Sequence, residues 1–133
     1  MIRTGQTRRL ALAALVLVTL GLSSAALGAA GGVPGTYTTT ITKPSQLKGK
    51  WTLTFAKGGT YKVILNGRTL GRGTYSATAT TVTMREPAGH GCGGSGTYAW
   101  RKSRTTMRFI RKREAASCGV RGTVLARPFR VVR

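Results

Sequence analysis

The side chains best suited to acid–base, nucleophilic or metal chemistry are few in this chain and gather in two segments. One glycine-rich stretch, REPAGHGCGGSG, holds the single histidine, His90, together with Glu86 and Cys92. The other glutamate and the other cysteine, Glu114 and Cys118, follow further along the chain, and the sequence has no aspartate. An acid–base or metal site would therefore have to draw mainly on these five residues.

These residues make a poor catalytic set. Glycoside hydrolysis needs two carboxyl groups, and the arginines and lysines beside Glu86 and Glu114 would keep both ionised and remove the general acid. Zinc takes three or four ligands, and one histidine with two glutamates falls short. A cysteine nucleophile needs a free thiolate beside a base, and no glycine-rich phosphate loop follows a strand and opens a helix. We therefore expect no enzymatic activity, no cofactor, no metal and a solvated His90.

The N-terminal segment, residues 1–30, reads as a secretory signal peptide. Three arginines precede a short apolar core, Leu10–Leu22, and small residues follow it. We expect cleavage after Ala30, with Ala26 and Gly28 as other possible sites; an uncleaved N-terminal anchor is the alternative. The mature protein is then expected to be exported, with residues 31–133 forming one small domain.

The composition is strongly basic. Against two acidic side chains the 133 residues hold 22 Lys and Arg, a formal charge of +20, and loss of the three signal-segment arginines would leave about +17. Such a charge attracts wall polymers, acidic polysaccharides, nucleic acid or anionic headgroups; a solvated basic surface that binds nothing is the alternative. The candidate polyanion-binding residues lie in RKSR and RKR: Arg101, Lys102, Arg104, Arg111, Lys112 and Arg113.

Alternation of apolar and polar residues predicts an all-β domain. In KWTLTF, for example, Trp51, Leu53 and Phe55 share one face, the period-two pattern of a half-buried strand. Asn66-Gly67 is a type I′ hairpin signal. Following an extended segment, GTYTTTIT, the expected strands are 49–56, 60–65, 70–77, 81–85, 96–102, 105–113 and 122–131. About eight short strands with frequent turns predict a small antiparallel up-and-down barrel.

The meander also predicts which loops lie together. The connections after Leu65, Arg85 and Arg113 and the segment 43–49 should share one end of the barrel, and tight turns should occupy the other. Cys92 and Cys118 then lie at the same end, and in an exported chain they are expected to form a disulfide. Two free or intermolecular thiols are the alternative.

A family resemblance covers nearly all of the expected domain. Gly49-Lys50-Trp51 resembles the Gly-x-Trp signature of lipocalins and the wider calycin superfamily. The later series GTY, GTYAW, TMRF and VLARPF is similar to short lipocalin-like barrel domains of secreted bacterial proteins, although the chain is shorter than a typical lipocalin and lacks its flanking helix. The resemblance implies that an arginine of the last strand packs across the signature tryptophan, here Arg127 on Trp51.

Two binding functions follow as expectations. The resemblance implies a carrier that holds a small hydrophobic ligand inside the barrel, and the charge predicts a module that adheres to anionic polymers, with the barrel filled. We expect a monomer with no specific nucleic-acid partner. The candidate interior residues are Trp51, Phe55, Tyr61, Tyr75, Tyr98, Trp100 and Phe109.

Overall fold

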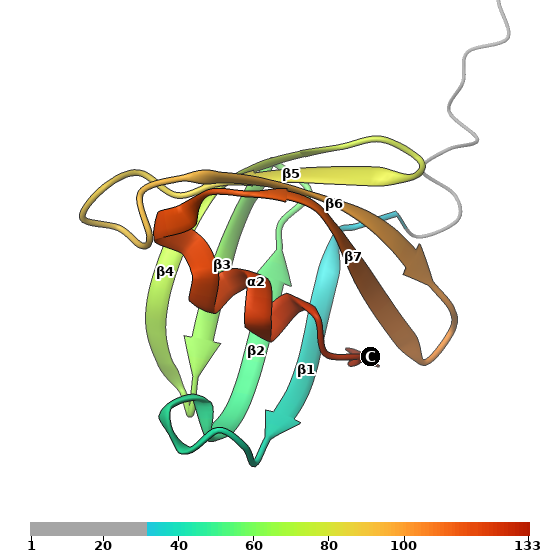
Figure 1. The fold of residues 1–133 in the computed structure, drawn as a ribbon. Coiled ribbons are helices and arrows are strands. Elements are labelled where there is room, and N and C mark those ends of the chain that lie inside the picture. The colour runs from blue at the N-terminus through green and yellow to red at the C-terminus, as the bar shows by residue number, and fades with distance from the viewer. Residues whose placement is uncertain (1–31) are drawn as a thin grey trace, which may run out of the picture.

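The computed structural model describes residues 32–133 as a closed barrel of eight antiparallel strands, each paired with its neighbours in sequence, β1 to β8 (Figure 1). The all-β meander predicted from the sequence is thus confirmed, while the expected signal peptide, residues 1–30, lies outside the described residues. The strands are β1 Gly35–Ile41, β2 Gly49–Phe55, β3 Thr60–Leu65, β4 Arg68–Ala77, β5 Thr81–Arg85, β6 Ser95–Lys102, β7 Thr106–Glu114 and β8 Phe129–Val132.

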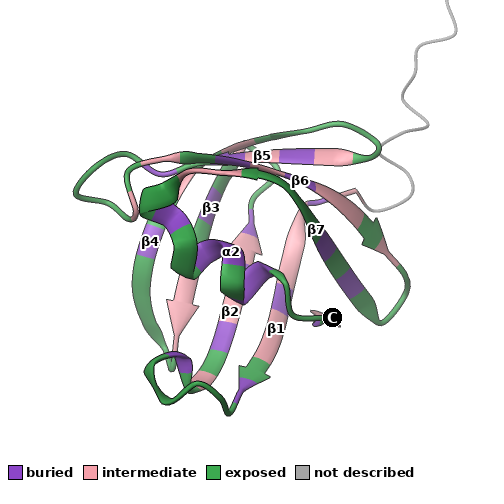
Figure 2. Ribbon diagram, viewed as in Figure 1, coloured by how far each residue is buried: buried purple, intermediate pink, exposed green. Residues whose placement is uncertain are grey.

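Alternating side chains build the core, as the sequence pattern predicts. Trp51, Leu53 and Phe55 of β2 are buried, and the threonines between them are half-buried. The same alternation buries Val82 and Met84 of β5, and Figure 2 shows the alternation of buried and more exposed residues along several strands. Burial of one face of each strand removes apolar area from water, which is the main favourable contribution to folding.

Antiparallel order places the connections as predicted. Segments 42–48, 66–67, 86–94 and 115–128 lie at one end, which we call the mouth, and the short turns 56–59, 78–80 and 103–105 lie at the other. The two-residue connection at the mouth has positive φ at both Asn66 (49°) and Gly67 (83°), the conformation that a type I′ hairpin requires.

The end of the chain departs from the prediction. The expected strand 122–131 is wrong in its first half, because helix α2 spans Gly119–Leu125 and β8 begins only at Phe129. Strand propensity of the valines and the threonine is overridden by packing, since Arg121, Val124 and Leu125, spaced i, i+3 and i+4, are all buried. In Figure 1, α2 crosses in front of β2 and β3.

Two short 3₁₀ turns complete the mouth. One, η1, spans Ser45–Leu47, and Leu47 accepts a 2.7 Å hydrogen bond from the Trp51 indole through its carbonyl oxygen. The other, η2, spans Ala116–Cys118 and leads directly into α2. Among the described residues no helix is long and apolar enough to cross a membrane.

β8 closes the barrel with few contacts. It pairs with β1 through three residue pairs and with β7 through two, Thr106 with Arg130 and Met107 with Phe129. β7 and β6, by contrast, pair through seven. On the side of β7 that faces β8, strand pairing stops at Met107, and the rest of β7 lies beside helix α2.

Aromatic rings fill the interior. Phe55 lies at the centre of the cluster, with ring centroids 5.7 Å from Tyr61, 5.0 Å from Tyr75 and 6.0 Å from Phe109. Tyr37 is fully buried and contacts both Phe55 and Phe109 at 6.0 and 6.3 Å. Offset and edge-to-face contacts of this kind stabilise a core beyond the effect of burial alone.

Candidate functional site

The disulfide predicted from the sequence is present at the mouth. Cys92 and Cys118 are bonded, with Cα atoms 5.0 Å apart, and the bond ties the segment 86–94 to the start of α2. The Sγ of Cys92 lies 3.4 Å from Glu86 Oε2; as a disulfide sulfur it has no proton to donate. His90, at the tip of this loop, is exposed, and its backbone carbonyl accepts a 2.8 Å hydrogen bond from the amide of Arg72.

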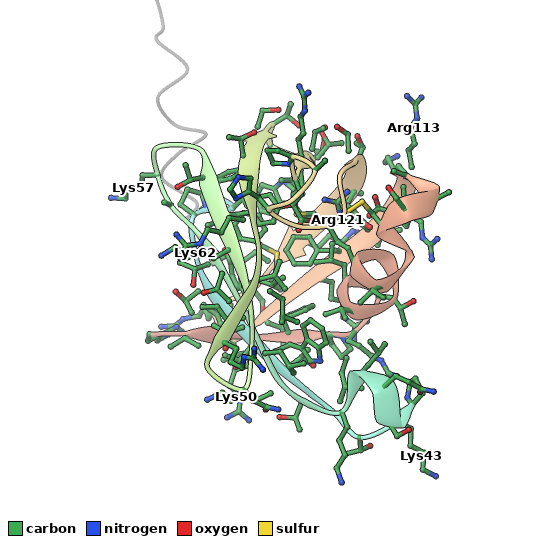
Figure 3. All side chains as sticks on the ribbon, turned by 90° about the vertical axis from the view of Figure 1, so that its left-hand side faces the viewer. Lys43, Lys50, Lys57, Lys62, Arg113 and Arg121 are labelled. Atoms are coloured by element: carbon green, nitrogen blue, oxygen red, sulfur yellow. A yellow bond between two sulfur atoms is a disulfide. The ribbon has the colours of Figure 1, made fainter. Side chains whose placement is uncertain are left out.

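The buried side chain of Arg121 forms ion pairs with both acidic residues of the chain. Its guanidinium lies 2.7 Å from Glu86 Oε2 and 2.7 Å from Glu114 Oε1, and its Nε donates to Glu114 Oε2 at 3.0 Å. It also donates to the Tyr61 hydroxyl at 3.0 Å and to the carbonyl of Gly94 at 3.2 Å. All five N–H donors of an arginine are thereby used. Figure 3 places Arg121 inside the molecule, whereas the other labelled basic side chains extend outward.

We call this group, with Tyr98, the Arg121 cluster. Tyr98 donates its hydroxyl hydrogen bond to Glu114 Oε2. Each member comes from a different part of the chain: Tyr61 from β3, Glu86 from the loop just after β5, Tyr98 from β6, Glu114 from β7 and Arg121 from α2. The cluster therefore fixes α2 to four separate parts of the barrel wall.

Electrostatics shift the pKa values of four members of the cluster, Tyr61, Tyr98, Glu114 and Arg121. Burial alone would raise the pKa of Glu114, but hydrogen bonds from Arg121 and Tyr98 outweigh it and hold the pKa below its ordinary value. Burial alone would lower the pKa of Arg121, but its contacts with Glu114 outweigh burial and raise that pKa. The pKa values of Tyr61 and Tyr98 rise because of burial, with the adjacent glutamates adding to the effect.

This arrangement offers little to acid–base catalysis. Glu114 is held as a carboxylate and Arg121 keeps its proton, while both tyrosines keep theirs. In residues 32–133 no three His, Cys, Asp or Glu side chains lie together as metal ligands would. The cluster has the chemistry of a structural crosslink between α2 and the barrel wall.

A pocket of about 520 Å³ opens beside the cluster at the mouth. We call it the mouth pocket. Its apolar lining comes from β2, β3, β4 and α2, and its polar lining includes Arg72, Glu86, His90 and Arg121. Its lining residues include Trp51, Leu53, Val63, Leu70, Gly71, Arg72, Glu86, His90, Gly91, Val120, Arg121, Val124 and Leu125.

A second hollow of about 460 Å³ lies where α2 and the turn before β8 meet β6 and β7. Four arginines line it, together with apolar and aromatic residues, and we call it the arginine groove: Arg101, Arg108, Arg111 and Arg127. Arg101 and Arg108 sit directly opposite each other across the two strands. Like charges at such positions are unfavourable unless something neutralises them.

The predicted interior aromatics fall into two groups. Trp51, Phe55, Tyr61, Tyr98 and Phe109 are buried, and all but Trp51 and Tyr98 contact another ring. Tyr75 and Trp100 are half-buried and pack against the same core. Trp100 lies towards the end opposite the mouth, where its indole donates to the carbonyls of Thr78 and Thr81 at 3.1 and 3.2 Å.

The prediction that Arg127 faces the interior from the last strand is wrong. Arg127 lies in the exposed turn between α2 and β8, because the chain is helical up to Leu125. Its guanidinium donates to the carbonyl of Lys43 at 2.8 Å, so it joins the two sides of the mouth. Among residues 32–133 the cation–π contact is that of Lys102 with Tyr37, at 5.3 Å, and not one between Arg127 and Trp51.

The six predicted polyanion-binding residues do not form one patch. Arg101 and Arg111 line the arginine groove, and Lys112 and Arg113 are exposed near the mouth end of β7. Lys102 is half-buried at the opposite end, where its ammonium donates to the Gly32 carbonyl at 3.2 Å and its pKa is lowered by burial. The remaining residue, Arg104, is exposed in the turn between β6 and β7.

Sequence reasoning missed Arg121 and Arg108 as site residues and assigned Arg127 to Trp51 instead of the arginine groove. The signal for Arg121 was the rarity of acidic residues: two glutamates expected near one mouth, in a chain this basic, call for a buried cation between them. Arg108 and Arg127 could not be recognised without the helix that brings the turn before β8 beside β7. No protein-family model, curated protein or solved structure matches this chain.

Proposed function

We propose that the protein is an exported binding protein that adheres to a linear anionic polymer through its basic surface, with the arginine groove as the main contact. One observation carries the proposal: in residues 32–133 both glutamate side chains are buried against Arg121, so no exposed side-chain carboxylate lies among the remaining basic residues. Three of the 22 Lys and Arg lie before residue 32, and Arg121 is internal, which leaves 18.

The groove suits closely spaced phosphate, sulfate or carboxylate groups. Arginine binds such groups through two parallel hydrogen bonds and keeps its charge at every physiological pH. Arg101 and Arg108 repel each other across the strands, and an anion between them would relieve that repulsion. Ile110, which is exposed and lines the same groove, gives the backbone of a polymer an apolar surface to contact.

The alternative is the small hydrophobic ligand inside the barrel. The interior positions expected to hold it contact one another, with Phe55 in ring contacts to four neighbours. A ligand there would have to displace these rings, at a cost in packing. The observations thus favour the polymer over a ligand in the barrel interior.

Membership of a lipocalin-like lineage is part of the proposal. The eight-stranded antiparallel barrel is compatible with it, and the hydrogen bond from the Trp51 indole to the 3₁₀ turn gives the Gly-x-Trp segment a structural role at the mouth. The disulfide fits an oxidising, extracytoplasmic compartment.

The test is binding of fluorescent polyphosphate, followed by anisotropy over a range of salt concentrations. A groove variant, Arg101→Gln with Arg108→Gln and Arg111→Gln, is compared with a control that loses the same charge elsewhere, Lys50→Gln with Lys57→Gln and Lys62→Gln. Figure 3 shows these three lysines extending outward, and none of them lines the arginine groove.

The groove variant should flatten the plot of log affinity against log salt by roughly 2 to 3 units, since each lost contact removes about 0.7–0.9. The control should change the slope by less than the amount expected for one lost contact. Equal slopes for the two variants would show that charge acts without a groove. An absence of binding by the unmodified protein at low salt would contradict the proposed function altogether.

A further inference from the structure

The mouth pocket has the features of a binding site for a small molecule that are missing from the filled interior. Its volume of about 520 Å³ lies within the range of ligand pockets, roughly 300–1,000 Å³. Its floor is formed by Trp51, Leu53, Val124 and Leu125, each no more than 2% exposed. These rigid, well-packed residues form a wall that does not need to rearrange to receive a ligand.

Exposed apolar side chains mark the rim. Among the described residues four large apolar side chains are exposed, and two of them, Leu70 (50%) and Val120 (57%), line this pocket. Leu70 comes from β4, at the irregularity in its pairing with β3, and Val120 comes from α2. Apolar rims around a concave apolar floor indicate a surface that is covered by a ligand when the protein functions.

Where Glu86 and Arg121 line the pocket, it accepts rather than donates, although Arg72 and His90 also belong to the lining. Arg121 has no N–H left to offer, because all five are used within the cluster. Glu86 binds Arg121 through Oε2, which leaves Oε1 with acceptor capacity. Two pocket-lining glycines flank that oxygen so closely that a Cβ at Gly71 or Gly91 would lie 2.2 or 2.0 Å from it.

We infer that the mouth pocket binds a small, largely apolar and uncharged molecule that donates a hydrogen bond, from a hydroxyl or amide group, to Glu86 Oε1. An anionic ligand would face the Glu86 carboxylate at close range. A cationic ligand would enter beside Arg72, which also lines the pocket, in a molecule that already carries a large positive charge. The bound molecule covers Leu70 and Val120 and lies against Trp51.

The experiment uses 1-naphthalenemethanol as a probe and two-dimensional NMR of the labelled protein with its disulfide intact. The probe has a flat apolar body and one hydroxyl donor. Its binding should shift the indole N–H signal of Trp51 and the amides of Gly71 and Val120, and leave the indole of Trp100 unmoved, because Trp100 lies outside this pocket. Affinity for a fragment of this size should be roughly millimolar.

Two variants test the rim. Leu70→Gln with Val120→Gln should weaken binding about tenfold or more, because the apolar contact area at the rim is lost. Val132→Gln is the control: this side chain is similarly exposed, at 46%, but lies outside both the mouth pocket and the arginine groove. Equal affinity of the two variants, or no shift of Trp51 in the unmodified protein, would overturn the inference.

Charge and salt separate this site from the polymer surface. 1-Naphthoate, which has the same ring and an anionic head, should shift the mouth-pocket signals more weakly than the alcohol does. Binding of the neutral alcohol should not change when salt is raised, whereas polyphosphate binding should weaken steeply. Stronger binding of the naphthoate in the mouth pocket would refute the role of Glu86, with or without a polymer site elsewhere.

Discussion

Replacing Arg121 by methionine should cost the domain a large part of its stability. Methionine keeps the apolar stem but removes five hydrogen bonds, two of them part of ion pairs at 2.7 Å. Glu86 and Glu114 side chains, 5% and 3% exposed, would then lie buried without a cation. Breaking a buried pair in this way costs about 3–5 kcal/mol, a large share of the roughly 5–15 kcal/mol by which small domains are stable.

Urea unfolding at pH 7.5, followed by tryptophan fluorescence with the disulfide intact, measures this loss. With a denaturant slope of roughly 1–3 kcal/mol per molar, the unfolding midpoint should fall by about 2 M. Arg108→Met is the control, because Arg108 is exposed and lies opposite another arginine. Its effect should stay within about 0.5 kcal/mol.

The pH dependence should change sign in the variant. In the unmodified protein the lowered pKa of Glu114 adds stability that is complete above its ordinary value of 4.5 and is lost as pH falls through the lower folded value. Without Arg121 the pKa of Glu114 in the folded state should rise above the unfolded value. The variant should therefore be more stable at pH 5 than at pH 8.

A neutral triple variant isolates the cause. Adding Glu86→Gln and Glu114→Gln to Arg121→Met removes the uncompensated charges and should recover most of the lost stability. A single variant that loses less than about 1 kcal/mol would refute the reasoning that buried carboxylates need this arginine. So would a triple variant no more stable than the single one.

Three further outcomes are expected. Reduction of Cys92–Cys118, which closes a loop of 26 residues, should lower the unfolding free energy by about 3.5 kcal/mol, and calorimetry with and without reductant would check it. Gly73→Ala should destabilise by about 1–3 kcal/mol or more in urea unfolding, because its Cβ would lie 2.0 Å from a backbone carbonyl, whereas Gly58→Ala, with open space around it, should not. The pKa values of three buried tyrosines, Tyr37, Tyr61 and Tyr98, are raised above the ordinary value of 10. The contribution of these tyrosines to the stability of the domain should therefore be complete below pH 10 and be lost as pH rises further, which alkaline unfolding curves would show.

The barrel was predictable because its strands obey a local rule. Alternation placed Trp51, Leu53 and Phe55 inside, and Asn66-Gly67 set the hairpin between two strands whose bounds the pattern gave closely. Antiparallel order then placed both cysteines at one mouth, from which the disulfide followed. Each of these inferences needs only neighbouring residues and the parity of a strand.

Helix α2 was not predictable in the same way. Val120, Thr123 and Val124 favour strands, and the helical face that begins at Arg121 is hidden because its first member is charged. What makes the segment helical is the set of bonds from Arg121 to Tyr61, Glu86 and Gly94, which are far away in the chain. The arginine groove and the mouth pocket both depend on that helix, so neither could be located from the sequence.

The short pairing of β8 with β1 and β7 determines where the folded molecule opens first. Three pairs on one side and two on the other give its amides the fewest cross-strand bonds in the barrel, so local opening and hydrogen exchange should begin there. The segment just before it does not follow, because Cys118 is covalently tied and Arg121 is bonded to four other elements or loops. Strand β8 can therefore detach and return while the segments at the mouth keep their positions. The fluctuations of β8 then remain confined to the end of the chain.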